Sequence, residues 1–376
     1  MEINIEQMSQ GKRRICLVSY GNPYLLPYIN TYIDSIKAEG AECCLLYWDR
    51  NKNGNQEDLK SFPDCKHFPF SCYMPTEGAS KWIKLNNYIK ATRYIIKVIK
   101  EEKFDGLVFL QTQAAVACLN VLRRFYKQRY IVDVRDYTME DNALYKYFET
   151  KVFSTAYRVV ISSPAYKNFL PKAEYVLSHN YTEFPKESAD AIRDRHFDKD
   201  LISISFVGAV RYYEMNRRLL DLFANDSRFK ICFYGRGSET LEDYAKERGI
   251  SNVDFHGSFP QSKTLEFYEN TSLINNLYGN HNKFLDYALS NKLYHAAQLY
   301  IPILVCPETY MEEVTLEYGL GFVVNLDDDA TPDKLYNQYE ALDWSKFKDN
   351  CDKFVNKVKE DNQLFNDVCS SFAKGI

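Results

Sequence analysis

The sequence predicts an α/β protein with two doubly wound parallel sheets. The chain has 376 residues, more than one hydrophobic core usually supports, so two domains are expected. Short, continuously apolar runs alternate with amphipathic helical patterns along both halves. Strands of that kind are typical of parallel sheets that helices cover on both faces.

Six such runs mark strands in the first half, with helical patterns between most of them. They span residues 13–20, 41–48, 105–111, 129–134, 157–162 and 173–178. A charged connector without a strand pattern follows at 186–200. Six more runs mark the second half, at 201–209, 229–235, 253–258, 272–278, 301–306 and 321–326. We therefore expect ligands at the carboxyl ends of these strands, in a cleft between two similar halves.

The composition favours a cytoplasmic enzyme. No apolar run approaches the length of a membrane span, and the N-terminal residues 1–14 lack the apolar core of a signal peptide. The ten cysteines show neither a zinc-ligand spacing nor a disulfide framework, and several fall in expected buried strands. With a formal net charge of −4 and no recognition motif, nucleic acid is not an expected partner.

The segment from Ser290 to Val305 is the most informative stretch of the chain. It begins with Ser290, Asn291 and Lys292, continues as a short amphipathic helix, and ends in a buried strand after Pro302. A helix N-terminus offers unpaired N–H groups and the positive end of a dipole, which suits phosphate. An ordinary helix-to-strand unit would give the same pattern.

This segment resembles the donor-binding element of GT-B glycosyltransferases, in particular the retaining enzymes of family 4. There, a loop of the type P/S-x-K-L-x-E-Y opens a helix that leads to G-x-P and a strand. The stretch 307–324 is similar to the segment that follows in that family. The resemblance implies two Rossmann-like domains, with an acceptor domain at 1–185, a donor domain at 186–350, and a C-terminal helix at 351–376 that packs back on the first.

One departure from the family is clear. The family helix carries the second Glu of a pair spaced eight apart, and this Glu binds the ribose hydroxyls. Tyr287 and His295 occupy those positions here. A neutral imidazole can still exchange one hydrogen bond with a hydroxyl, and a protonated one can contact phosphate. The resemblance therefore implies an altered nucleotide contact.

Three further strand ends of the second half give donor-site candidates. Gly208 ends the first strand and Arg211 follows it, which in the family brings backbone and a basic side chain to the diphosphate; a tight turn with a surface arginine is the alternative. Gly235 lies in a G-x-G pair, a weak signal that a turn also explains. His256 and Gly257 lie at the end of the third strand, where the family holds the base through main-chain groups.

The first half offers two loops. Gly21 follows the first strand, where GT-B enzymes place a mobile glycine loop, although Gly-Asn-Pro is also a good turn. Arg135 and Asp136 follow the strand at 129–134. Asp136 can hold or deprotonate an acceptor hydroxyl while Arg135 orients it; helix caps and a surface ion pair explain these residues nearly as well. The carboxylates at 326–329 suggest a helix cap, so no metal is assigned.

Positive charge gathers between residues 81 and 129, where eleven Lys/Arg stand against three Asp/Glu. The helix expected at 81–103 interleaves these charges with apolar side chains. Such helices bind anionic membrane surfaces at the inner face of a cell membrane, but a helix with a buried apolar face and a solvated basic face has the same pattern.

The residues and the resemblance together predict a hexosyltransferase. It would move a sugar from a nucleoside diphosphate sugar, with UDP favoured, to a glycan or lipid-linked acceptor in capsule or O-antigen synthesis. Arg211 and Lys292 would stabilise the departing diphosphate, without a metal and with retention of configuration. A sugar-nucleotide epimerase of the same fold and a non-catalytic binding subunit remain alternatives.

Overall fold

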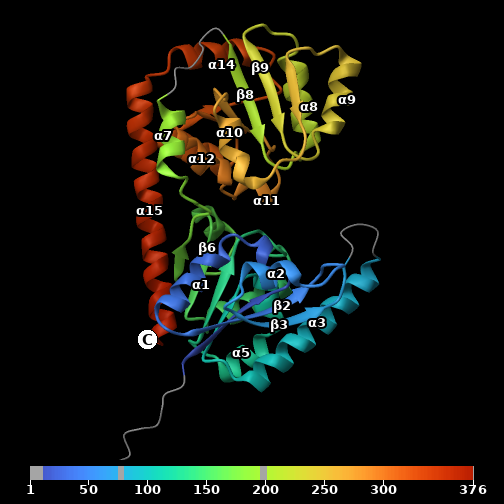
Figure 1. The fold of residues 1–376 in the computed structure, drawn as a ribbon, viewed down its shortest axis with the longest axis vertical. Coiled ribbons are helices and arrows are strands. Elements are labelled where there is room, and N and C mark those ends of the chain that lie inside the picture. The colour runs from blue at the N-terminus through green and yellow to red at the C-terminus, as the bar shows by residue number, and fades with distance from the viewer. Residues whose placement is uncertain (1–11, 75–79, 195–200, 376) are drawn as a thin grey trace, which may run out of the picture. The chain divides into compact units, whose positions relative to one another are not determined.

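The computed structural model describes residues 12–74, 80–194 and 201–375 (Figure 1). Within them the chain forms two compact units. The first comprises residues up to His179 and the last residues from Asp361, and the second runs from Asn180 to Glu360. Each unit is built on a parallel sheet.

In the described residues of the first unit, seven strands lie in the order β3-β2-β1-β4-β5-β6-β7. Their bounds are β1 Arg14–Ser19, β2 Glu42–Asp49, β3 Lys66–Ser71, β4 Gly106–Phe109, β5 Tyr130–Val134, β6 Arg158–Ile161 and β7 Tyr175–Leu177. The α-helices are α1 Ile29–Ala38, α2 Gln56–Ser61, α3 Lys81–Glu102, α4 Thr112–Ala117, α5 Leu119–Phe125 and α6 Ala143–Phe153, and short 3₁₀ helices span Pro23–Leu25 and Pro164–Asn168.

In the described residues of the second unit, six strands lie in the order β10-β9-β8-β11-β12-β13. Their bounds are β8 Ile202–Val207, β9 Phe229–Tyr234, β10 Val253–His256, β11 Leu273–Asn276, β12 Ile303–Val305 and β13 Gly321–Val323. The helices are α7 Lys186–Arg193, α8 Tyr213–Leu222, α9 Glu239–Arg248, α10 Thr264–Tyr268, α11 Lys283–Asp286, α12 Asn291–Leu299, α13 Tyr310–Tyr318 and α14 Thr331–Glu340, with a 3₁₀ turn at Gln261–Lys263.

Alternate residues of most strands in the second unit enter two separate cores. Ile204 and Phe206 of β8 pack with helices α8, α9 and α14, whereas Val207 packs with α7, α12 and α13. Since helices cover both faces, the strands are mostly apolar, as the sequence predicts, although the edge strand β10 exposes Asp254 and His256. The two-sheet, doubly wound fold is confirmed.

A single helix, α15, spans Trp344–Lys374. Phe347, Cys351 and Phe354 belong to the core of the second unit, while Phe365 and Phe372 belong to that of the first. The sequence left open whether one or two helices form here.

Two local features were not anticipated from the sequence. The connector expected at 186–200 contains helix α7, whose Ala189 and Ile192 are buried; residues 195–200 lie outside the described part. The sequence also missed β3, which holds Pro69 at the edge of the first sheet. Proline lacks an N–H donor and is tolerated at an edge, so its presence hid the strand.

Among the described residues, no helix is both long and apolar enough to cross a bilayer. All ten cysteines are described, and none forms a disulfide. Cys16, Cys43, Cys44, Cys232 and Cys306 are buried in or beside strands, as expected from the sequence.

Candidate functional site

A pocket of about 610 Å³ lies at the carboxyl ends of β8, β9 and β11 in the second unit. The sheet order reverses between β8 and β11, and such switch points are where doubly wound sheets bind ligands. We call it the cationic pocket. Its lining residues are Val207, Gly208, Ala209, Arg211, Tyr212, Gly235, Arg236, Ser258, Phe259, Thr264, Tyr278, Ser290, Asn291, Lys292 and His295.

Two glycine turns shape one wall of this pocket. Gly208 and Gly235 follow adjacent strands and adopt φ values of +129° and +143°. A Cβ at Gly235 would lie 1.8 Å from the carbonyl oxygen of Gly208, so no larger residue fits without moving the backbone. Gly235 is therefore required by the close approach of the two turns, a reason stronger than the G-x-G spacing alone.

Two arginines stand on these turns. The side chains of Arg211 and Arg236 are exposed, both line the pocket, and neither makes a hydrogen bond or ion pair with another described residue. Guanidinium groups bind phosphate through paired N–H donors. Both arginines are thus available to an anionic ligand.

Helix α12 begins at the opposite wall. Ser290 caps it, and its side-chain oxygen accepts a hydrogen bond from the N–H of Lys292 at 3.3 Å. Ser290, Asn291 and Lys292 all line the pocket, as the sequence predicts for a phosphate-binding helix start. The positive end of the helix dipole adds to the arginine charges.

Lys292 is more buried than a simple phosphate contact requires. Its side chain is 6% exposed, and Nζ donates to the hydroxyl of Tyr278 at 2.6 Å and lies 3.7 Å from the ring centroid of Phe206. No carboxylate pairs with it among the described residues. Aromatic faces and one hydroxyl compensate its charge only in part, so the pocket keeps an excess of positive charge.

His295 stands where the resemblance to family 4 places a carboxylate, and its pKa lies well below neutral. Burial, and then the charge of Lys292, lower the pKa of His295 to about 4. Its Nδ1 lies 3.1 Å from the hydroxyl of Tyr268. The alternative of a protonated histidine on phosphate is therefore disfavoured, and a neutral hydrogen bond to a hydroxyl remains. Tyr287, at the other family position, ends α11 and does not line the pocket.

The third strand contributes differently from the expectation. His256 and Gly257 do not line the pocket, and the lining begins with Ser258 and Phe259. The His256 ring stacks on Tyr234 with centroids 4.8 Å apart, and its carbonyl accepts the N–H of Gly235 at 2.9 Å. His256 therefore supports the Gly235 turn.

Comparison with solved structures identifies this architecture. Sucrose-phosphate synthase from Thermosynechococcus elongatus matches with a TM-score of 0.66 at 12% identity, over 95% of this chain and 96% of that one. Anabaena HepE, solved in complex with UDP, matches with a TM-score of 0.66 at 11% sequence identity, over 95% of this chain and 100% of that one. The lipopolysaccharide outer core galactosyltransferase WaaB matches with a TM-score of 0.61 at 13% sequence identity, over 95% of this chain and 99% of that one.

The chain has the GT-B fold. No protein-family model matches its sequence, and no curated protein matches it either. The expectation of a GT-B architecture from the Ser290 segment is confirmed, while membership of family 4 stays a prediction.

In the first unit of this GT-B chain, Arg135 is already engaged. Its side chain is 7% exposed, and it donates to both carboxylate oxygens of Asp133, at 2.6 and 2.7 Å, and to the carbonyl of Ser178 at 2.9 Å. Tyr32 also donates to Asp133. Asp133 and Arg135 therefore form a buried ion pair, not the surface ion pair considered from the sequence, and Arg135 links β5 to the end of β7. Because most of its N–H donors are already used, Arg135 has few left to bind a substrate.

The other two first-unit candidates lie at strand ends. Asp136 reaches the surface, and desolvation raises its pKa while the charge of Arg135 lowers it. Gly21 follows β1, is partly buried, and has no atom within 4 Å of a Cβ built on it. A 3₁₀ turn, Pro23–Leu25, separates it from α1, so the helix does not follow immediately as expected.

Sequence reasoning missed several lining residues of the pocket, including an arginine and two tyrosines. Arg236 lies between the glycines of the G-x-G pair, and its position after a strand end was a usable signal. The rings of Tyr278 and Tyr212 pack together with centroids 4.8 Å apart and planes tilted by 31°, and both line the pocket. Nothing in their sequence contexts marks them, because aromatic residues make up 15% of the chain.

Proposed function

We propose that the protein is a glycosyltransferase whose second unit binds a nucleoside diphosphate sugar. One observation carries this proposal: Arg211, Arg236 and Lys292 line a single pocket, and no acidic residue lines it among the described residues. A diphosphate supplies the missing negative charge, and the pocket volume of about 610 Å³ is in the range of small-molecule sites.

The structural neighbours support UDP as the nucleotide. Anabaena HepE was solved with UDP, with UDP and glucose, and with UDP-glucose. WaaB is described as a lipopolysaccharide galactosyltransferase. By analogy we propose hexosyl transfer from a UDP-sugar to a glycan or lipid-linked acceptor, in capsule or O-antigen synthesis.

The proposed reaction depends on stabilising the leaving group. Arg211, Arg236 and the start of α12 neutralise the charge that develops on the diphosphate as the glycosidic bond breaks. These groups make a metal-independent reaction feasible. We further propose that Asp136 binds the acceptor hydroxyl and that the departing diphosphate receives its proton, with retention at the anomeric carbon.

Helix α3 supports a membrane-associated acceptor. Trp82, Ile83 and Leu85 near its N-terminus are 80%, 53% and 51% exposed, and lysines alternate with them. Apolar side chains beside lysines bind anionic bilayers. We expect the double variant Trp82→Glu/Ile83→Glu to lose sedimentation with anionic vesicles, whereas Leu364→Glu, which changes an equally exposed leucine of α15, keeps it. Equal binding by both variants would rule out this role for α3.

One observation favours a second candidate, a non-catalytic sugar-nucleotide subunit. The pKa of His295 is lowered to about 4, and His295 stands where the resembling family has the carboxylate that binds the ribose hydroxyls. The variant His295→Glu distinguishes the two. A large gain in nucleotide affinity would indicate that the site has lost part of its nucleotide binding and would favour the non-catalytic subunit. A loss of affinity would show that His295 itself contributes to nucleotide binding and would favour the enzyme. An epimerase would instead convert the sugar nucleotide without any acceptor.

Calorimetry with UDP, ADP and GDP tests the donor proposal directly. We expect UDP to bind to the wild-type protein, and the double variant Arg211→Ala/Arg236→Ala to lose at least tenfold in affinity. Arg218→Ala, on the exposed side of α8, is the control. Folded protein that binds none of the nucleotides contradicts the proposal.

A further inference from the structure

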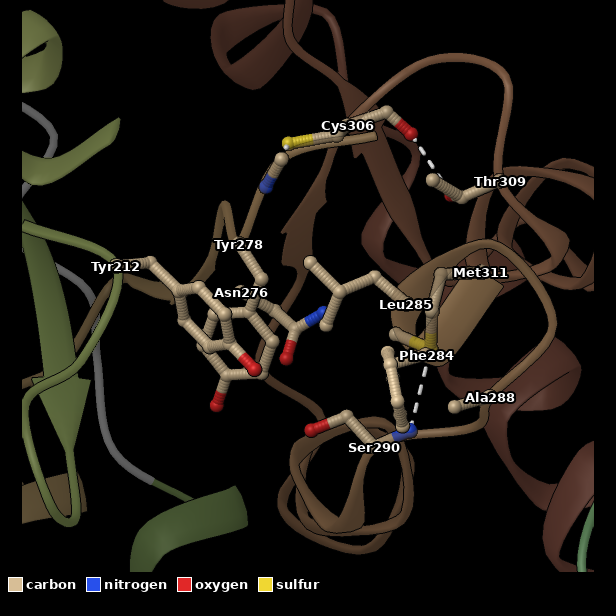
Figure 2. A pocket seen from close by; sticks show the side chains of 11 residues that line it. Tyr212, Asn276, Tyr278, Phe284, Leu285, Ala288, Ser290, Cys306, Thr309 and Met311 are labelled. Carbon is tan, nitrogen blue, oxygen red and sulfur yellow. Dashed lines mark hydrogen bonds between the residues drawn. The ribbon is translucent and has the colours of Figure 1, made fainter. Parts of the chain in front are cut away.

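A second, smaller pocket adjoins the cationic pocket. Its volume is about 180 Å³, and it shares Tyr212, Tyr278 and Ser290 with the larger one (Figure 2). The pocket is too small for a nucleotide but large enough for one sugar substituent. We call it the side pocket.

Most of the side pocket is apolar. Phe284, Leu285, Ala288 and Met311 line it together with the tyrosine pair (Figure 2). Met311 does accept a hydrogen bond through Sδ, from the N–H of Ser290 at 3.4 Å. These walls favour a methyl or methylene group over a hydroxyl.

Several polar side chains of the side pocket already have partners within the protein, among them the Tyr278 hydroxyl, which accepts from Lys292 Nζ. Thr309 donates to the carbonyl of Cys306 at 2.9 Å and accepts from the N–H of Glu312. Ser290 accepts from the N–H of Lys292. Thr309 thus uses both its donor and its acceptor within the protein, whereas the contact of Ser290 uses only its acceptor.

Asn276 is the exception. It ends β11, is 4% exposed, and its Oδ1 has no hydrogen-bond partner among the described residues. Figure 2 shows its amide in the pocket, between the tyrosine pair and Leu285. The preceding residue, Asn275, is fully used: it donates to Asn216 at 3.4 Å and accepts from the N–H of Leu277 at 2.9 Å.

An unpaired buried amide oxygen is costly. A buried polar group without a partner destabilises a protein by about 1–3 kcal/mol. A ligand that pairs with it recovers this cost on binding. Because an amide offers both a donor and an acceptor, its best complement is another amide.

We propose that the side pocket receives the acetamido group of a 2-acetamido sugar, with Asn276 as its hydrogen-bond partner. The acetamido N–H and C=O match the two ends of the Asn276 amide, and its methyl group contacts Leu285 and Met311. A plain hydroxyl would satisfy Asn276 but not the apolar walls, and a 6-deoxy methyl would do the reverse. This inference rests on the proposed function, since the sugar must be attached to a nucleotide in the cationic pocket.

Calorimetry with three ligands tests the inference: UDP, UDP-glucose and UDP-N-acetylglucosamine. In the wild-type protein we expect the N-acetylated sugar to bind about tenfold more tightly than the glucose compound, the equivalent of one good hydrogen bond. The variant Asn276→Ala should reduce this ratio to about one. Asn337→Ala, an exposed asparagine of α14, should leave the ratio at its wild-type value.

A second variant tests the volume of the side pocket. Ala288→Leu fills the side pocket and keeps Asn276, so it should weaken the N-acetylated sugar more than UDP-glucose. Thermal unfolding without ligand distinguishes a structural role: because the Asn276 amide oxygen has no partner, Asn276→Ala should unfold at the wild-type temperature or above it.

The outcomes separate the two proposals. Equal affinity for both sugars, in protein that binds UDP, overturns the side-pocket inference and leaves the proposed function standing. A wild-type preference that survives Asn276→Ala also overturns it. Failure of all three ligands, UDP included, overturns the proposed function and this inference together.

Discussion

The two units of this GT-B chain share a doubly wound sheet but treat polar groups at the strand ends in opposite ways. In the first unit Asp133 and Arg135 pair with each other. In the second unit Arg211 and Arg236 have no described partner, and Lys292 has no carboxylate. We call the paired Asp133 and Arg135 the closed arrangement, and the unpaired cations of the cationic pocket the open arrangement. The same type of fold carries both.

The difference indicates where a ligand is needed to complete the structure. The Asp133–Arg135 pair satisfies its charges internally and holds the first sheet together. The cationic pocket leaves charge uncompensated in a partly buried place, which costs stability unless an anion binds. The uncompensated positive charge of this pocket, rather than charged residues as such, is what points to the proposed ligand site.

Breaking the closed arrangement should have the largest effect. We expect Arg135→Ala to lower the free energy of unfolding by about 3–5 kcal/mol, because it leaves Asp133 charged and buried. Denaturant unfolding measures the loss, and Arg93→Ala, an exposed arginine of α3, serves as the control. A loss of unfolding free energy below 1 kcal/mol would mean that the pair does not stabilise the fold. Arg135 would then again be a candidate for orienting the acceptor.

The first unit also holds a carboxyl group that burial keeps protonated. Glu149 is fully buried, neither carboxyl oxygen has a described partner, and burial and then Glu140 raise its pKa to about 8. The folded state binds a proton that the unfolded chain releases near pH 4.5. Stability should therefore fall by about 4 kcal/mol from pH 4.5 to 8.

Replacing Glu149 by Gln should remove this decline. The variant would be more stable than wild type at pH 8 and nearly equal to it at pH 4.5, while the exposed Glu57→Gln follows the wild-type curve. Parallel curves for Glu149→Gln and wild type would show that Glu149 is ionised in the folded protein.

The second unit should weaken at the opposite end of the pH range. The pKa of His295 is lowered to about 4 by burial and by Lys292. The unfolded chain takes up a proton as the pH falls through about 6.5, whereas the folded state does not. Stability should fall by about 3 kcal/mol from pH 6.5 to 4, and be fully present above pH 6.5.

His295→Asn tests this expectation, because asparagine does not titrate. Its stability should vary less than that of wild type between pH 6.5 and 4, and hydrogen exchange in α12 should report the difference locally. His281→Asn, on an exposed loop, is the matched control. If His295→Asn loses as much stability between pH 6.5 and 4 as the wild type, groups other than His295 cause the loss.

Most of the fold could be predicted because its signals are local. The continuous apolar strands alternate with helices, as is typical of parallel α/β sheets, and twelve of the strands among the described residues fall on predicted runs. Strand β3 was missed because Pro69 and polar residues interrupt its pattern. Its place at the sheet edge depends on pairing with β2, which its own residues do not reveal.

The site was predicted in part, for a physical reason. Gly208, Arg211, Gly235 and the Ser290 helix start are turn and cap residues, whose roles follow from local backbone chemistry. Tyr278 and Asn276 depend on side-chain packing between distant elements, so sequence spacing carries no signal for them. The neutrality of His295 likewise follows from its burial, which becomes visible only in the folded chain.

Removing one arginine from the open arrangement should have the smallest effect on stability and a selective effect on binding. Arg211→Ala removes an exposed side chain without a described partner, so the unfolding free energy should change by less than about 0.5 kcal/mol. One charge-assisted contact to a diphosphate contributes about 1.5–3 kcal/mol, a ten- to hundredfold change in Kd for UDP. Calorimetry at two salt concentrations measures it, because a lost ionic contact also reduces the salt dependence of binding. A large loss of stability with unchanged UDP affinity would show that Arg211 resembles Arg135, and the contrast between the two units would disappear.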